Sequence, residues 1–160
     1  MDLNRLTQKS QDALHEAQAI AIRHGHIEVD GEHLLAALLR QEAGLIPRLF
    51  SKMEVPVGKL DEALEKELSS RPRMSGPGVE PGKVYVTQRL NRILLDAEKE
   101  AQRLKDEYVS VEHLALALLS ETGETPAKKI FRQFQIDRQK FLQILADVRG
   151  NQRVQSANPE

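Results

Sequence analysis

The sequence predicts an all-α protein, an eight-helix globule made of two pseudo-twofold four-helix repeats. The chain repeats its own pattern 80 residues later, and its apolar residues recur at helical spacing. Residues that favour helix N-termini precede most of these stretches. A fixed-period duplication indicates that one supersecondary unit was copied, so the repeated positions should be mainly structural. Function is therefore sought where the two copies differ and where they meet.

The duplication is visible in short motifs. The Thr-Gln pair that begins at Thr7 recurs at Thr87, and the Glu-His-Leu triplet that begins at Glu32 recurs at Glu112. The repeat of a histidine in both triplets predicts a structural role for it, in packing or hydrogen bonding near a helix start. Beyond the triplets the register shifts by one residue, which pairs Phe50, Val55, Leu60 and Leu64 with Phe131, Ile136, Phe141 and Leu145.

The first copy begins with two predicted helices. Thr7 is the expected N-cap of the first, and Gly25 is expected to end it in a left-handed conformation. Asp30 is expected to cap a short second helix that continues through Leu39, and Gly44 is expected to close its end. Both helices carry apolar residues at a spacing that buries one face.

Two more helices complete the first copy. A short one is expected over residues 46–53, and Pro56 marks a turn because proline disfavours helix at the residue before it. The single apolar stripe formed by Leu60, Leu64 and Leu68 predicts the fourth helix.

The second copy repeats this plan. Pro126 fits the first position of a helix, where its missing N–H costs nothing. Gly150 is expected to end the last helix. The expected N-caps are Thr87, Ser110, Thr125 and Asp137.

The repeats also predict the domain organisation. Residues 1–149 should form one domain, with repeat 1 at about 5–68, a linker at about 69–86 and repeat 2 at about 87–149. The linker is rich in proline and glycine, which mark loops. The polar stretch 150–160 is expected to be a flexible tail.

Composition excludes several function classes. The net charge of −1 argues against electrostatic capture of nucleic acid, and the absence of cysteine removes disulfides and thiol chemistry. The longest apolar runs have six residues, whereas a membrane span needs about 20. The stretch from Gly78 to Lys83 has the wrong glycine spacing for a phosphate-binding loop, and Val84 stands where serine or threonine is required. We therefore expect no cofactor site, no metal site and no catalytic residues in this chain.

One difference between the copies stands out. The first copy has His26 where the second has Asp106, so the second alone places two carboxylates, Asp106 and Glu112, on either side of Tyr108. Two interpretations remain open for this pair. The carboxylates belong either to the solvated face of an amphipathic helix or to a surface that contacts a partner.

The repeated unit and its linker resemble the Clp N-terminal repeat domain of AAA+ chaperones. The resemblance covers essentially all 160 residues. The Pro/Gly linker and the closing Gly-Asn-Gln-Arg stretch favour the protein-disaggregase branch of this family over its ClpA and ClpC members. The matching stretches are residues 5–11, 32–35, 71–76, 111–114 and 149–154.

The resemblance implies a non-catalytic substrate-binding domain. In the family this domain is joined flexibly to ATPase modules, binds unfolded or aggregated polypeptides and assists their entry into the pore of a homo-hexamer. The implied partners of the full-length protein are an Hsp70-type chaperone system, ATP and magnesium, in the cytoplasm during stress. The present chain is then expected to be monomeric, without ATP hydrolysis, nucleic acid or membrane. The alternative is an adaptor-docking domain, as in the ClpA/ClpC-type unfoldases.

The resemblance also implies site residues. It places Thr7, Asp106 and Glu112 on the substrate-binding surface, beside a shallow apolar groove. The first helix of the second copy would line that groove with Ile93 and Leu94. Ile93 breaks the symmetry between the copies by its apolar bulk, since the first copy has alanine there.

Overall fold

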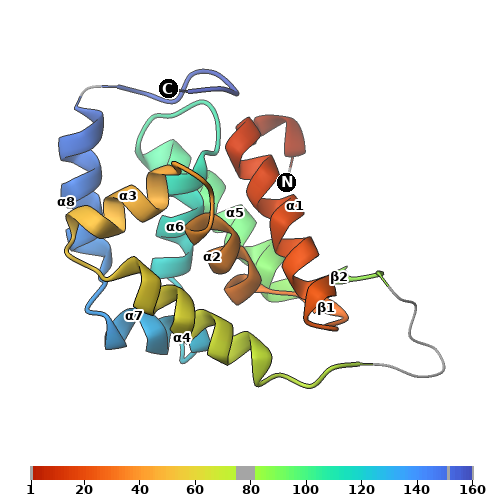
Figure 1. The fold of residues 1–160 in the computed structure, drawn as a ribbon. Coiled ribbons are helices and arrows are strands. Elements are labelled where there is room, and N and C mark those ends of the chain that lie inside the picture. The colour runs from red at the N-terminus through yellow and green to blue at the C-terminus, as the bar shows by residue number, and fades with distance from the viewer. Residues whose placement is uncertain (1, 75–81, 151, 160) are drawn as a thin grey trace.

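The structure is a computed structural model that describes residues 2–74, 82–150 and 152–159, and the described part contains eight α-helices (Figure 1). The all-α fold of two four-helix repeats is thereby confirmed. A 3-10 turn (Leu3–Arg5) precedes the helices of the first copy, which are α1 (Gln8–Arg23), α2 (Gly31–Leu39), α3 (Leu45–Lys52) and α4 (Val57–Ser69). Those of the second copy are α5 (Gln88–Arg103), α6 (Val111–Leu119), α7 (Pro126–Gln133) and α8 (Arg138–Arg149).

The helix boundaries reproduce the duplication. Helices α1 and α5 each have 16 residues and begin 80 residues apart, at Gln8 and Gln88. Helices α3 and α7 each have 8 residues and begin 81 residues apart, at Leu45 and Pro126. The shift by one residue within the repeat therefore lies between α6 and α7.

Side chains cap the helices as the sequence indicates. Thr7 accepts a hydrogen bond from the Ser10 amide at the start of α1, and Thr87 accepts the equivalent bond from the Leu90 amide at the start of α5. At α2 and α6 the repeated histidine completes the cap. The Asp30 amide donates to His33 Nδ1 at 2.9 Å, and the Ser110 amide donates to the equivalent nitrogen of the second histidine at 2.8 Å. The structural role predicted for this histidine is confirmed.

Two local predictions need correction. Gly44 does not close α2, which ends at Leu39; it is the N-cap of α3. The sequence also gave no sign of a short parallel pair between β1 (Glu28–Val29) and β2 (Tyr85–Val86). Four residues of strand lack the length that makes an alternating pattern visible.

The strand pairing links the copies reciprocally. Val29 of the first copy pairs with Val86, and the equivalent pair, Leu6 with Val109, forms a bridge on the other side. The Thr87 amide donates to the Val29 carbonyl and the Thr7 amide donates to the Val109 carbonyl. Each copy thus holds the entrance to the other copy's first helix, as a pseudo-twofold arrangement requires.

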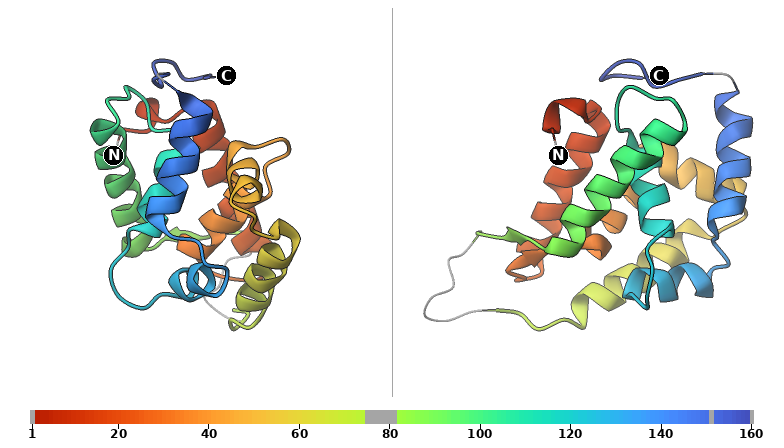
Figure 2. Two further views of the ribbon diagram at one scale, coloured as in Figure 1. Left: turned by 90° about the vertical axis from the view of Figure 1, so that its left-hand side faces the viewer. Right: turned by 180° about the vertical axis from the view of Figure 1, so that it is seen from behind.

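Helices α2 and α6 form the centre of the molecule, and the other helices surround them (Figures 1 and 2). Every residue of α2 is buried, as are residues 111–118 of α6. Their apolar runs leave no polar face, and the Glu-His pair at the start of each helix has buried polar partners. Phe50 and Phe141 meet edge to face near this core, with ring centroids 6.1 Å apart. No helix in the described ranges is long and apolar enough to cross a bilayer.

Candidate functional site

The candidate site lies where the N-terminus of α1, the turn between α5 and α6 and the end of α8 come together. Thr7 is fully buried there, with its hydroxyl next to that of Ser10 at 3.1 Å. The Ser10 hydroxyl in turn donates to the Val109 carbonyl at 2.9 Å. This chain of hydrogen bonds fixes the start of α1 to the segment that leads into α6.

Asp106 is the most extensively bonded side chain of the site. One carboxylate oxygen, Oδ2, accepts from His113 Nε2 at 2.6 Å. The other, Oδ1, accepts from Arg149 Nη2 at 2.5 Å and from the Val154 amide at 2.8 Å. Burial alone would raise the pKa of Asp106, but these hydrogen bonds outweigh it and hold the pKa below its usual value. The carboxylate is therefore an ionised, buried anchor for three separate segments.

Glu112 lies beside this anchor. Its carboxylate accepts from the Ser110 hydroxyl, and Arg149 Nη1 is 3.9 Å from its second oxygen. Asp106 and Glu112 are only 5% and 4% exposed. The interpretation of the pair as a solvated helix face is therefore wrong, because Arg149 brings a compensating charge from the distant end of α8.

The two apolar residues assigned to the groove are also buried. Ile93 is 1% exposed and Leu94 is 8% exposed, and both contribute to the hydrophobic core. A substrate role for these two and for Thr7, Asp106 and Glu112 stays a prediction. Ile93 packs at the start of α2, where a Cβ on Gly31 would lie 3.1 Å from Ile93 Cδ1, so the structure does not bring it beside Asp106. Buried residues of this set would contact a substrate only after the surface opens.

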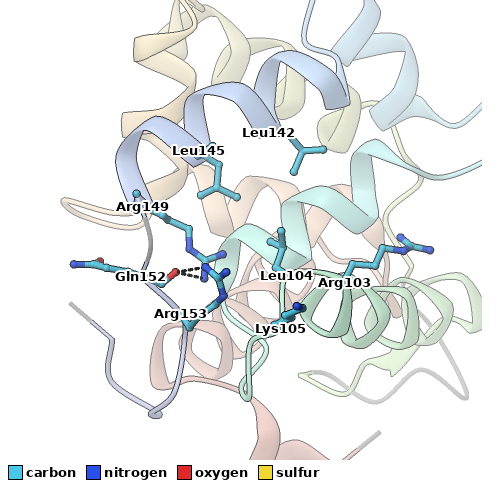
Figure 3. A pocket seen from close by; sticks show the side chains of 10 residues that line it. Arg103, Leu104, Lys105, Leu142, Leu145, Arg149, Gln152 and Arg153 are labelled. Carbon is cyan, nitrogen blue, oxygen red and sulfur yellow. Dashed lines mark hydrogen bonds between the residues drawn. The ribbon is translucent and has the colours of Figure 1, made fainter.

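An open pocket is lined in part by Arg149, the residue that binds Asp106 (Figure 3). Its volume is about 390 Å³, and Leu104, Leu142 and Leu145 give it an apolar floor. Basic side chains, Arg103 and Lys105 among them, lie around its rim, and no carboxylate lines it in the described part of the chain. Sequence reasoning missed this pocket because its two walls, from α5 and α8, lie about 40 residues apart and share no motif.

The first copy has a different arrangement at the equivalent place. His26 Nδ1 and His33 Nε2 are 2.9 Å apart, so two imidazoles stand where the second copy pairs Asp106 with a histidine. Because His33 Nδ1 accepts from the Asp30 amide, its Nε2 carries the proton and donates to His26. No three His, Asp or Glu side chains among the described residues are placed to hold a metal ion together.

A buried ion cluster joins the two copies on the other side of the molecule. Glu32 is fully buried and accepts from Arg71 at 2.7 Å and from two nitrogens of Arg89 at 2.8 Å. The Ala127 amide at the start of α7 donates to the same carboxylate at 2.9 Å. Glu121 binds Arg89 from the far side. The hydrogen bonds from Arg89 and Arg71 overcome the effect of burial and lower the pKa of Glu32 to about 2.

Close packing at this junction gives a testable difference between two glycines. A Cβ on Gly31 would lie 2.8 Å from Arg89 Nη2 and 3.1 Å from Ile93 Cδ1, whereas one on Gly58 would meet nothing within 4 Å. Gly31→Ala is therefore expected to lower the free energy of unfolding by about 1–3 kcal/mol. Gly58→Ala, inside α4, should raise it by about 0.4–1 kcal/mol. Urea denaturation of both variants checks this, and equal effects would contradict the close contact at Gly31.

The chain matches known proteins over its whole length. Residues 5–156 match the family model described as the Clp repeat (R) N-terminal domain. The chaperone protein ClpB of Nitratidesulfovibrio vulgaris is 54% identical over 160 residues, which cover all of this chain and 18% of that protein. The chain thus spans less than a fifth of the length of this relative.

Solved structures show the same fold. The Hsp104 N-terminal domain from Candida albicans has a TM-score of 0.81 at 22% identity and covers 96% of this chain and 97% of that one. A second solved structure, whose description names a peptide from the EAEC T6SS Sci1 SciI protein, has a TM-score of 0.72 at 22% identity, with 99% and 96% covered. The family match and the ClpB relative together show that this chain belongs to the Clp repeat N-terminal domain family.

Proposed function

We propose that this domain binds unfolded or aggregated polypeptides for a ClpB-type disaggregase. The observation that supports it most directly is the open pocket with its apolar floor and basic rim. Unfolded chains expose apolar side chains that folded proteins bury, so short apolar contacts can hold many unrelated substrates. The 54% identity to a ClpB chaperone supplies the biological context.

The wider setting is part of the same proposal. The longer protein would assemble as a homo-hexamer in the cytoplasm, hydrolyse ATP with magnesium in other modules and work with an Hsp70-type system. This domain would deliver substrates to the hexamer pore without a catalytic or nucleotide site of its own. The adaptor-docking function of the ClpA/ClpC type predicts instead one folded partner.

The charges on the pocket define which substrates should bind best. Asp106 and Glu112 are buried and lie next to Arg149, so they offer no free negative charge to a basic chain. Arg149 and Arg103 are likewise paired, with Asp106 and Glu100, and Lys105 adds a positive charge to the rim, which therefore favours acidic segments that flank an apolar residue. Binding should be weak, because a small pocket buries little area and the substrate loses chain entropy.

An NMR titration tests the proposal. The labelled domain is titrated with reduced, carboxymethylated α-lactalbumin, an acidic chain that cannot refold. We expect shifts around Lys105, Leu142 and Arg149 that shrink but persist in high salt, because only the charged part of the contact is screened. Shifts confined to Gln18 and Ile22 of the first copy, or none at millimolar probe, would overturn the site.

A pair of substitutions on α8 sharpens the test. Leu142 is half-buried in the pocket, whereas Val148 is exposed on the same helix and does not line the pocket. Leu142→Asn should weaken probe binding about tenfold, the equivalent of roughly 1.4 kcal/mol, and Val148→Asn should leave it unchanged. Circular dichroism checks that both variants keep their helical content.

A further inference from the structure

The C-terminal segment, residues 152–159, lies over the candidate site. It runs from the end of α8 across the molecule to the N-terminus of α1 (Figures 1 and 2). Gly150 ends α8 with a φ of +58°, which lets the chain turn away from the helix axis. Arg149 then donates from Nη2 to both Asp106 and the Gln152 carbonyl. The last turn of α8 therefore directs the segment onto the site.

The segment is held mainly through its backbone. The Glu107 and Tyr108 amides both donate to the Val154 carbonyl, at 2.8 and 3.3 Å. The Val154 amide donates to Asp106 Oδ1 at 2.8 Å. Further along, the Gln8 amide donates to the Ala157 carbonyl at 2.7 Å. With the Arg149 guanidinium, which donates to the Gln152 carbonyl, the site supplies four donors and one acceptor to the backbone of the segment.

Only one side chain of the segment is buried. Val154 is 4% exposed, whereas its neighbours Arg153 and Gln155 are exposed. The segment bends at residues 156–158, and its interaction requires accessible backbone groups around one apolar side chain, with little else specified. An unfolded polypeptide offers the same groups wherever an apolar residue occurs, and extended peptides commonly bind through such backbone hydrogen bonds.

We propose that the C-terminal segment is a built-in competitor that occupies the backbone-binding part of the polypeptide-binding surface, next to the pocket that Gln152 and Arg153 help to line, until a substrate displaces it. This regulation rests on the function proposed above. The segment is tethered only a few residues from its docking site, so its effective concentration there is high and weak ligands are excluded. Its release would free Asp106 Oδ1 and the amides of Gln8, Glu107 and Tyr108 for a substrate backbone.

The docked segment also contributes to the burial of Asp106. Asp106 gives one of its two oxygens to the Arg149 guanidinium and the Val154 amide, so the docked segment covers it. The backbone-binding part of the surface would be available only in the fraction of molecules in which the segment has left. The apparent affinity for substrate falls in proportion to that fraction.

The first test displaces the segment without shortening the chain. Val154→Asp places a charge in the buried position, beside the Asp106 carboxylate. Gln155→Asp adds the same charge at an exposed position and is the matched control. Val154→Asp should bind reduced, carboxymethylated α-lactalbumin about tenfold more tightly than the unmodified chain, if the segment is docked about 90% of the time. Gln155→Asp should bind it as the unmodified chain does.

The second test locks the segment in place, which covers the case that Val154→Asp perturbs folding. The backbones of Gln8 and Ala157 are hydrogen-bonded neighbours, and the chain contains no cysteine, so Gln8→Cys with Ala157→Cys offers a single possible disulfide. The oxidised protein should lose probe binding at least about tenfold and regain it on reduction.

The outcomes separate the two proposals. A peptide with the sequence of residues 150–159 should bind the Val154→Asp variant and displace the probe from it. If the unmodified, Val154→Asp and oxidised proteins all bind the probe equally, the competition is overturned and the proposed function stands. If none of them binds the probe while the peptide binds Val154→Asp, the proposed function is overturned, and the competition for substrate with it.

Discussion

Replacing Glu32 by alanine is expected to lower the free energy of unfolding by about 3–5 kcal/mol. The carboxylate is fully buried and accepts four hydrogen bonds, from Arg71, from two nitrogens of Arg89 and from the Ala127 amide. Its removal takes away the acceptor that two guanidinium groups and a helix N-terminus share, and leaves Arg89 with Glu121 and Arg71 with Glu67. The loss of four hydrogen bonds to one buried charge, three of them from guanidinium groups, sets the size of the effect.

The matched control is Glu112→Ala in the second copy. Glu112 is also buried, yet in the described part of the chain its carboxylate has only the Ser110 hydroxyl nearby and a guanidinium at 3.9 Å. Its loss should cost about 1–2 kcal/mol, in the range of an ordinary buried hydrogen bond. Urea denaturation of both variants gives the comparison. Equal losses would show that the four-donor arrangement around Glu32 adds nothing to stability.

The position of this cluster explains why the effect should be large. Glu32 belongs to the first copy, while Arg89 and Ala127 belong to the second, so the carboxylate links the two repeats. Arg89 replaces the lysine that the duplication places at position 9 in the first copy. A guanidinium can bind a carboxylate through two parallel hydrogen bonds, which an ammonium cannot. The arginine that distinguishes the second copy from the first therefore binds the two copies together.

Much of the fold follows from local chemistry. Threonine, aspartate or serine capping residues placed the starts of six helices, and Gly150 placed the end of α8. Both signals act within about one helical turn of the residue that carries them. Helices α3 and α4 begin after Gly44 and Pro56 without a side-chain cap. The duplication then doubled each observation, because a boundary found in one copy could be checked against the other.

The candidate site was less accessible to sequence reasoning. The sequence gives no reason to expect Asp106 to be buried, because its partners Arg149 and Val154 lie 43 and 48 positions away along the chain. No periodicity links a turn after α5 to the end of α8. The docked position of residues 152–159 was hidden for the same reason, since a polar stretch with one valine has no pattern that indicates burial.

The histidine difference between the copies predicts a loss of stability in mild acid. Burial and the nearby Arg71 lower the pKa of His33 to about 4, and burial and the nearby His24 lower that of His26. A proton on the pair would set two N–H groups against each other, because His33 Nε2 already donates to His26 Nδ1. Both rings are therefore held neutral in the native state.

The sign of the effect follows from these shifts. Well above pH 6.5 the imidazoles are neutral in both the native and the unfolded state, so their protonation does not lower the free energy of unfolding. As the pH falls from 6.5 to 4.5, the unfolded chain binds protons that the native pair refuses, so the free energy of unfolding decreases by about 2 kcal/mol for His33 alone. Glu32 and Asp106, whose pKa values are lowered, add their losses only at more acidic pH.

The second copy supplies the variant that removes this loss. His26→Asp gives the first copy the pair that Asp106 and His113 form at 2.6 Å. A carboxylate facing His33 stabilises its charged form, so the folded pKa rises toward the unfolded value and the slope between pH 6.5 and 4.5 should fall by at least about half. His15→Gln, at an exposed histidine, should leave the slope unchanged. Urea denaturation across this range decides the matter, and an unaltered slope in His26→Asp would show that the buried histidine pair does not set the acid sensitivity.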